Sequence, residues 1–426
     1  MVTETREATS HLIRNIGTLM LVPPGPISGR QMQTVPCLRN AALLIRDGRI
    51  AWFGPARDAP LDEGVATLSA EGGCLIPGLI DCHTHIPFAG SRSDEFLQRL
   101  RGRSYLEILA AGGGIHATCR AVRAATLDEL VVENLPRLQR MLELGVTRVE
   151  CKSGYGLSPE HELKQLEAIR ELDRQQPIDL EPTYLAAHAL PAEFQEHPDE
   201  FIDLMTGDEL LADIVRRGLA RFCDVFCDRG AFNVAQARHV LRRAAAAGLR
   251  PRLHADELAQ VGATRLAGEL RAVSADHLEQ INEAGIVALK AAGTVAVVLP
   301  GTSFFLGIPH CDVRKLIDAD LPVAVATDFN PGTCMIESLP WVMNIACCQL
   351  RMLPNEVLVA CTANAAAALE VHRRVGAIQT GFDADLVVLD VPSLEEWFYT
   401  PGRPRVRMVI KNGRVVYRRP DHAHRS

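Results

Sequence analysis

Two histidines separated by a single residue, His83 and His85, end an apolar run that begins after Pro77-Gly78. If residues 78–85 form a strand, both imidazoles lie on one face, because successive side chains of a strand alternate. Two imidazoles that converge from a strand end form half of a site for a transition metal. Because a lone His-x-His pair is common by chance, the rest of the chain must supply the other ligands.

Two more polar residues end apolar runs further along the chain, and they complete a ligand set. The expected ligands are His83, His85, His254 and Asp328. Three imidazoles and one carboxylate suit one divalent or trivalent ion per subunit, Zn²⁺ or Fe³⁺. A two-metal site of this type would need a bridging ligand, often a modified lysine, at the end of the fourth strand, where Phe222-Cys-Asp-Val-Phe-Cys-Asp228 has no lysine. A metal with one open position lowers the pKa of bound water toward about 7 and so provides a nucleophile.

Residues near these ligands could transfer protons. Glu257 follows His254 by three residues and could carry a proton above the metal. The alternative is a solvated carboxylate at the N-terminus of a helix. His277 could polarise a carbonyl oxygen or hold the nucleophile, and the alternative is a buried structural histidine. The expected catalytic residues are Glu257, His277 and Asp328.

Two loops contain groups that could bind a substrate. Arg92 lies seven residues after His85, and its guanidinium suits bidentate capture of a carboxylate, unless it is an ordinary surface arginine. Tyr155, between two glycines in Lys152-Ser-Gly-Tyr-Gly156, presents a phenol to the site. Lys152 itself has an open role, with pairing to an acid as one possibility. Ala111-Gly-Gly-Gly-Ile115 lacks the Lys-Ser/Thr of a phosphate loop, so we expect it to line the mouth of the site.

Eight short β-like runs alternate with amphipathic helical stretches and would position these residues. The runs fall at 78–85, 147–152, 180–188, 222–228, 251–256, 272–277, 294–299 and 322–328. The clearest helical stretches are Leu127–Leu144, Pro159–Arg174 and Val234–Ala247. The pattern predicts an α/β fold, a (β/α)8 TIM-like barrel, over a doubly wound open sheet. The candidate site residues support the barrel, since they lie at carboxyl-terminal strand ends, where barrels carry active sites.

Short β-like runs punctuated by glycine and proline occupy both ends of the chain. Asn412-Gly413 between two such runs is a strong hairpin signal. We therefore expect residues 1–75 and 376–426 to form one small β-sandwich domain, with the barrel over 76–375.

Composition excludes several classes of protein. A net charge of −7 over 426 residues argues against a nucleic-acid partner. No apolar run approaches the roughly 18 residues of a membrane helix, and Ile16–Val22 is too short for a secretory signal. The twelve cysteines form no disulfide framework. We expect a cytoplasmic enzyme with reduced thiols and no membrane partner.

Several segments together resemble the amidohydrolase superfamily, from about residue 13 to 418. They are Pro77-Gly-Leu-Ile-Asp-Cys-His-Thr-His85, Phe88-Ala-Gly-Ser-Arg92, Ala111-Gly-Gly-Gly-Ile115, Lys152-Ser-Gly-Tyr-Gly-Leu157, Ala187-His-Ala189, His254-Ala-Asp-Glu257 and Thr327-Asp-Phe-Asn-Pro-Gly-Thr333. The first is shared across the superfamily. The Lys152 and Thr327 segments are similar to those of the enzymes that hydrolyse 4-imidazolone-5-propanoate in histidine degradation.

The resemblance implies metal-dependent cleavage of a cyclic amide to N-formimidoyl-L-glutamate, and a homodimer. It places the small-molecule substrate, with its carboxylate tail, against Arg92, Tyr155, His188, Glu257, Asn330, Gly332 and Thr333. The segments Thr302–Phe305 and Cys334–Glu337 depart from the family pattern. Two alternatives remain: a mononuclear deaminase of an aromatic base, and a non-catalytic barrel that serves as a binding module.

Overall fold

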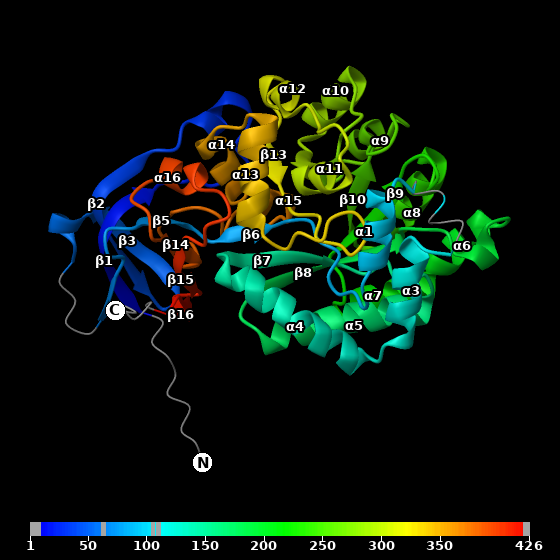
Figure 1. Ribbon diagram of the computed structural model, residues 1–426, viewed down its shortest axis with the longest axis horizontal. Coiled ribbons are helices and arrows are strands. Elements are labelled where there is room, and N and C mark those ends of the chain that lie inside the picture. The colour runs from blue at the N-terminus through cyan, green and yellow to red at the C-terminus, as the bar shows by residue number, and fades with distance from the viewer. Residues whose placement is uncertain (1–9, 61–64, 104–106, 108–111, 421–426) are drawn as a thin grey trace, which may run out of the picture.

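A parallel barrel forms the body of the computed structural model, which describes residues 10–60, 65–103, 107 and 112–420 (Figure 1). Its eight strands are β6 (Leu79–Asp81), β7 (Val146–Lys152), β8 (Asp179–Ala187), β9 (Phe222–Cys227), β10 (Arg250–Ala255), β11 (Ser274–His277), β12 (Val295–Val298) and β13 (Val323–Val325). They pair in chain order, each parallel to the next. The predicted barrel is confirmed, and the open doubly wound sheet is wrong.

Segments that follow β6 and β13 close the barrel. The Asp328 backbone N–H donates to His83 O at 3.0 Å, and the His85 N–H donates to Phe329 O at 3.0 Å. One prediction needs correction here, because β6 ends at Asp81 and both histidines lie beyond the strand rather than on it. After Asp81 the chain runs parallel to the segment around Asp328, with an isolated bridge between Thr84 and Phe329, and this pairing positions the two histidines.

Helices connect the strands around the outside of the barrel. The three predicted stretches form α4 (Leu127–Glu143), α5 (Pro159–Gln175) and α8 (Val234–Ala247). The other described helices are α1 (Ser93–Leu100), α3 (Ile115–Ala124), α6 (Pro198–Met205), α7 (Asp208–Arg216), α9 (Ala263–Glu269), α10 (Glu283–Ala292), α11 (Pro300–Leu306), α12 (Val313–Asp318), α13 (Leu339–Leu350), α14 (Pro354–Ala360), α15 (Ala363–Ala368) and α16 (Leu394–Tyr399), with short 3-10 turns η1 (Gly29–Gln33), η2 (Ala56–Asp58) and η3 (Ala192–Phe194).

Local chemistry explains why a helix such as α8 begins and ends where it does. The Asn233 side chain accepts hydrogen bonds from Ala235 N at 2.9 Å and Gln236 N at 3.0 Å, which satisfies two free N–H groups of the first turn. Gly248 ends the helix in the left-handed region, with φ of 109°. Val240 and Leu241 bury the inner face.

The two ends of the chain build a mixed sheet beside the barrel (Figure 1, blue and red strands). Its strands are β1 (His11–Met20), β2 (Cys37–Arg46), β3 (Arg49–Pro55), β4 (Ala66–Ser69), β5 (Cys74–Pro77), β14 (Leu386–Leu389), β15 (Val406–Lys411) and β16 (Arg414–Arg418). Antiparallel pairing of β5 with β14 joins the two ends. The predicted hairpin is present, with Asn412 at φ 48° and Gly413 at φ 78°. The domain boundaries at residues 75 and 376 stay predictions.

A buried ion pair ties this sheet to the barrel. Lys411 of β15 is only 3% exposed and donates to Asp385 at 2.8 Å and to Asp179, the first residue of β8, at 2.8 Å. Asp179 lies at the amino-terminal end of its strand, so this contact is at the opposite end of the barrel from the candidate site residues.

Two further observations concern membrane-spanning helices and the glycine-rich segment before α3. Within the described residues, no helix is long and apolar enough to cross a membrane. Ala111, the first residue of the glycine-rich segment, lies outside the described residues, whereas Gly114 precedes α3 in a conformation (φ 69°, ψ −151°) that favours glycine.

Candidate metal centre and active site

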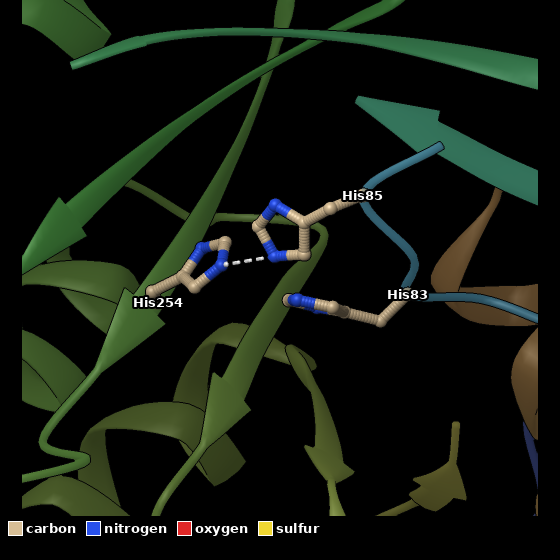
Figure 2. A group of neighbouring side chains, drawn as sticks. All are labelled: His83, His85 and His254. Carbon is tan, nitrogen blue, oxygen red and sulfur yellow. Dashed lines mark hydrogen bonds between the residues drawn. The ribbon is translucent and has the colours of Figure 1, made fainter. Parts of the chain in front are cut away.

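Three imidazoles and one carboxylate converge at the carboxyl-terminal end of the barrel. His83 and His85 come from the segment after β6 and His254 comes from β10 (Figure 2). Asp328 comes from the segment after β13. Asp328 Oδ1 lies 3.2 Å from His85 Nε2 and 3.5 Å from His83 Nε2. His254 Nε2 lies 3.3 Å from His85 Nε2. The structure thus brings together all four ligands predicted from the sequence.

The donor atoms of these four residues are better suited to binding a metal ion than to hydrogen bonding with one another. His83 Nε2 is buried without a hydrogen-bond partner among the described residues, an arrangement that is costly unless something else satisfies it. Burial lowers the pKa of His85, and burial only partly offset by Asp224 lowers that of His254 well below the usual range, so both rings are neutral. Neutral imidazole is the form that binds metals. The chain therefore contains a His/Asp metal-binding cluster.

Asp328 is held as an ionised carboxylate. Burial by itself would raise its pKa, but the neighbouring imidazoles of His83 and His85 outweigh burial and hold the pKa of Asp328 well below its usual range. Its second oxygen, Oδ2, accepts a hydrogen bond from Thr302 Oγ1 at 2.6 Å. Thr302 belongs to the segment that departs from the family pattern, and its hydroxyl fixes the orientation of a predicted ligand.

The proton-transfer candidates lie beside this cluster. His277 Nε2 is 3.6 Å from Glu257 Oε2, and its Nδ1 is 3.8 Å from Glu279 Oε2. The pKa of Glu257 is raised to about 7, chiefly by burial; His277 opposes the rise, and the nearby carboxylates of Glu279 and Asp328 add to it. His277 is buried with φ of 78°, a strained conformation for a residue other than glycine, and strain of this kind concentrates at functional sites. The sequence-based reasoning missed Glu279.

Asp228 orients the loop that carries Glu257. Its Oδ2 accepts hydrogen bonds from the backbone N–H groups of Glu257 at 2.7 Å and Leu258 at 2.8 Å, and its Oδ1 accepts one from Ala259 at 3.0 Å. These contacts cap the free N–H groups that follow β10, so Asp228 positions the backbone rather than facing the metal cluster.

Arg92 lies at the same end of the barrel and is paired with Glu95. Its Nε donates to Glu95 Oε2 at 2.9 Å and its Nη2 lies 2.8 Å from the same oxygen, while Glu95 Oε1 accepts from Gly114 N at 3.0 Å. The guanidinium packs against Gly332, where an added Cβ would lie 2.2 Å from Arg92 Nη1. Gly332 follows Asp328 by four residues, so the loop that carries this predicted ligand also contacts the guanidinium.

Tyr155 and His188 line the other side of the cluster. The His188 ring stacks on the His85 ring, with ring centroids 5.0 Å apart, and the ring centroids of Tyr155 and His85 are 6.0 Å apart. His188 Nδ1 donates to Gly154 O at 3.0 Å, and burial lowers the pKa of His188 to about 3, so the ring is neutral. Close approach explains Gly154, because a Cβ there would lie 2.9 Å from Leu185 O at a φ of 116°.

Helix α5 rigidly holds the loop that presents Tyr155. Glu162 accepts hydrogen bonds from Gly154 N and Leu157 N, both at 2.7 Å. Gln165 accepts one from Tyr155 N at 2.9 Å. These hydrogen bonds, with the close approach at Gly154, fix the loop that carries Tyr155.

Asn330 shapes the last of the predicted substrate-binding segments. Its Oδ1 accepts from Gly332 N at 2.8 Å and Thr333 N at 2.7 Å, and its Nδ2 donates to Asp328 O at 2.7 Å. These contacts are all internal to the loop, so Asn330 fixes the backbone that places Gly332 beside Arg92.

Lys152 points into the barrel and is fully buried. Its Nζ donates to Glu150 Oε1 at 2.6 Å and lies 3.1 Å from Asp224 Oδ2. It is therefore engaged by carboxylates. Sequence reasoning left this role open and missed Asp224 altogether, although charged residues at alternate positions of buried strands, such as Glu150 and Lys152, were a readable signal.

Comparison with known proteins places these features in context. The profile of the Amidohydrolase family matches residues 74–416. The chain is 44% identical to the imidazolonepropionase of Alkaliphilus oremlandii over 410 residues, covering 95% of this chain and 97% of that protein. It is 43% identical to the imidazolonepropionase of Bacillus velezensis over 410 residues, covering 96% and 97%.

Solved structures share the architecture at lower identity. A 5-methylcytosine deaminase from Klebsiella pneumoniae aligns with a TM-score of 0.72 and 19% identity, covering 96% of this chain and 99% of that one. A zinc-bound adenosine deaminase from Xanthomonas campestris aligns with a TM-score of 0.70 and 21% identity, covering 96% and 93%. At these identities the likeness shows the fold alone.

Proposed function

The chain belongs to the amidohydrolase family, where its relatives place it among the imidazolonepropionases, and from this premise we propose which residues carry out the reaction. That reaction is hydrolysis of the cyclic amide C–N bond of 4-imidazolone-5-propanoate to N-formimidoyl-L-glutamate, the third step of histidine degradation. The chain is thus a hydrolase of histidine metabolism with a metal-binding cluster.

One observation supports the assignment above the others: the loop that begins with the predicted ligand Asp328 also contacts the guanidinium of Arg92. Asp328 begins the loop as a predicted ligand, and Gly332 on the same loop contacts the guanidinium of Arg92. A substrate held by both must carry a carboxylate at one end and a bond open to hydrolysis at the other. 4-Imidazolone-5-propanoate has both, whereas an aromatic base has no carboxylate for Arg92.

Proton transfer is assigned to Glu257 and His277. When bound, the metal would act as a Lewis acid and lower the pKa of water, the source of the nucleophile. Glu257 accepts the proton of the attacking water at Oε2 and delivers it to the departing ring nitrogen. His277 donates from Nε2 to the oxyanion that develops on the ring carbonyl. Asp328 is the second candidate acceptor, but its low pKa favours Glu257.

The remaining predicted residues orient the substrate. Arg92 binds the propanoate through Nη1, since its other face is occupied by Glu95. Tyr155 and His188 pack against the imidazolone ring, next to His85. Thr333, with the backbone of Gly332, closes the pocket beside Arg92.

Three finer points belong to the same proposal. His83, His85, His254 and Asp328 would hold a single ion, zinc or iron, since Lys152 is engaged by two carboxylates and β9 offers no bridging lysine. The twelve cysteines, all within the described part of the chain, are unpaired, which agrees with a cytoplasmic location. A homodimer is proposed from the family resemblance.

The test is hydrolysis of freshly generated 4-imidazolone-5-propanoate, followed as loss of its ultraviolet absorbance with and without chelator. We expect chelator-sensitive loss with formimidoylglutamate as the product. Ammonia release from purines or pyrimidines, with no turnover of the imidazolone, would instead favour the deaminase alternative. Folded, metal-loaded protein with neither activity would favour the binding module.

A further inference from the structure

A cluster of charged side chains fills the barrel interior directly beneath the metal ligands. Its members come from four strands of the barrel (β7, β9, β10 and β11), and all are fully buried: Glu150, Lys152, Asp224, Arg252 and Asp276. Burying five ionisable groups in a barrel core is costly unless each is paired. Hydrophobic residues of similar volume would stabilise the core as well, so the cluster calls for an explanation beyond stability.

One arm of the cluster leads from Lys152 to His254. Lys152 Nζ lies 3.1 Å from Asp224 Oδ2, and the same oxygen lies 3.0 Å from His254 Nδ1. Asp224 Oδ1 also accepts a hydrogen bond from the backbone N–H of His254 at 3.1 Å. Asp224 therefore holds both the backbone and the ring of this histidine.

The second arm leads from Arg252 to His83. Arg252 Nη2 donates to Asp276 Oδ2 at 3.0 Å, and this oxygen lies 2.6 Å from His83 Nδ1. The guanidinium is itself anchored, because it donates to Cys82 O at 2.8 Å and to Ala368 O at 2.7 Å.

Glu150 joins the two arms. Its Oε1 accepts from Lys152 Nζ at 2.6 Å and lies 3.8 Å from Arg252 Nε. The cluster thus contains three carboxylates and two cations, and Asp328 above it adds another carboxylate. This leaves the interior with an excess of negative charge on the side that faces the metal ligands, which a bound cation would offset.

We propose that Asp224 and Asp276 are positioning residues for the metal, each accepting the Nδ1 proton of one ligand histidine so that its Nε2 lone pair faces the ion. Lys152 and Arg252 are the cations that pair with these carboxylates and hold them beside the two histidines. A carboxylate on the second nitrogen fixes the tautomer of a ligand histidine and raises its basicity, and loss of such a partner typically weakens metal binding 10- to 100-fold. The proposal rests on the proposed metal dependence.

The third histidine provides an internal contrast. Neither His85 Nδ1 nor His254 Nδ1 has a hydrogen-bond partner by strict geometry within the described residues, but a carboxylate oxygen of Asp224 lies 3.0 Å from His254 Nδ1, whereas the His85 ring is held by stacking on His188. The carboxylate support is therefore confined to His83 and His254, which makes the expected effects specific to two of the three rings.

The experiment measures the zinc dissociation constant of folded protein by competition with a chromophoric chelator. Asp276→Asn and Lys152→Met are expected to bind zinc about 10- to 100-fold more weakly than the wild type. Lys411→Met is the matched control, since Lys411 is a buried lysine between two aspartates at the other end of the barrel. It should lower the thermal midpoint without changing zinc affinity.

A measurement on the wild type keeps the proposal testable if a variant fails to fold. Nitrogen-15 NMR of the zinc-loaded protein should show the Nδ1–H tautomer for His83 and His254. The Nε2–H tautomer at either position would overturn the proposal. So would unchanged zinc affinity in Asp276→Asn and Lys152→Met, or an equal loss in Lys411→Met. If the wild type itself bound no metal, the proposed function would fail as well.

Discussion

Removal of the Arg92 side chain should weaken substrate binding with little effect on the chemical step. The side chain is only 11% exposed, and Nη1 is left to face the carboxylate of the substrate. Truncating one partner of a desolvated charge pair costs about 2–5 kcal/mol. At about 1.4 kcal/mol for each factor of ten, this predicts a fall in kcat/KM of roughly 30-fold to 5,000-fold for Arg92→Ala.

The pairing with Glu95 places the expected loss toward the upper end of this range. Without Arg92, the Glu95 carboxylate retains a hydrogen bond from Gly114 N, but its charge is no longer neutralised. Two like charges about 5 Å apart repel by about 3 kcal/mol at an effective dielectric constant of about 20. Because this repulsion needs the charge of Glu95, the double variant Arg92→Ala/Glu95→Gln should regain at least roughly tenfold in kcat/KM.

The assay compares KM and kcat for 4-imidazolone-5-propanoate and for the analogue with a propanamide tail. Wild type should prefer the carboxylate, and Arg92→Ala should lose that preference through KM while kcat stays within a few-fold. Arg99→Ala is the control, because Arg99 lies on the same helix, α1, and stacks on Phe305 instead. An unchanged KM in Arg92→Ala, or a double variant worse than the single one, would refute the reasoning.

Three other predictions concern Glu257 and Gly332. Glu257→Gln should lower kcat by roughly 10²- to 10⁴-fold with metal content unchanged, and full turnover with bound metal would exclude a role in proton transfer. Burial raises the pKa of Glu257 to about 7, and the group must be ionised to accept a proton, so kcat/KM should fall as the pH drops through this value. A bound cation would lower the pKa of Glu257. A midpoint of the kcat/KM profile above pH 7, or an unchanged acidic limb of that profile in Glu257→Gln, would therefore contradict the assignment. Gly332→Ala should raise KM at least about tenfold with kcat retained, because the added Cβ would lie 2.2 Å from Arg92 Nη1 and displace the guanidinium. An unchanged KM would show that the guanidinium can move without loss of substrate binding.

Local patterns in the sequence were sufficient for the elements and for the chemistry at their ends. Short apolar runs, helical periodicity and turn residues depend on neighbours in the chain, so α8 and the Asn412-Gly413 hairpin could be predicted to within a residue or two. The barrel followed from the count of alternating elements. Once a barrel was assumed, residues that end its strands had to meet at one rim, which is why His254 and Asp328 could be grouped with His83 in advance.

The tertiary structure alone decided the partners of the buried charges and the placement of strand ends. Asp276 meets His83, and Lys152 meets Asp224, only because β7, β9, β11 and the segment after β6 direct these side chains into one closed interior. The sequence shows each charge, but pairing across a barrel depends on strand register and stagger, which no local pattern encodes. For the same reason β6 could not be seen to stop at Asp81: its end is set by hydrogen bonds to the segment after β13, far along the chain.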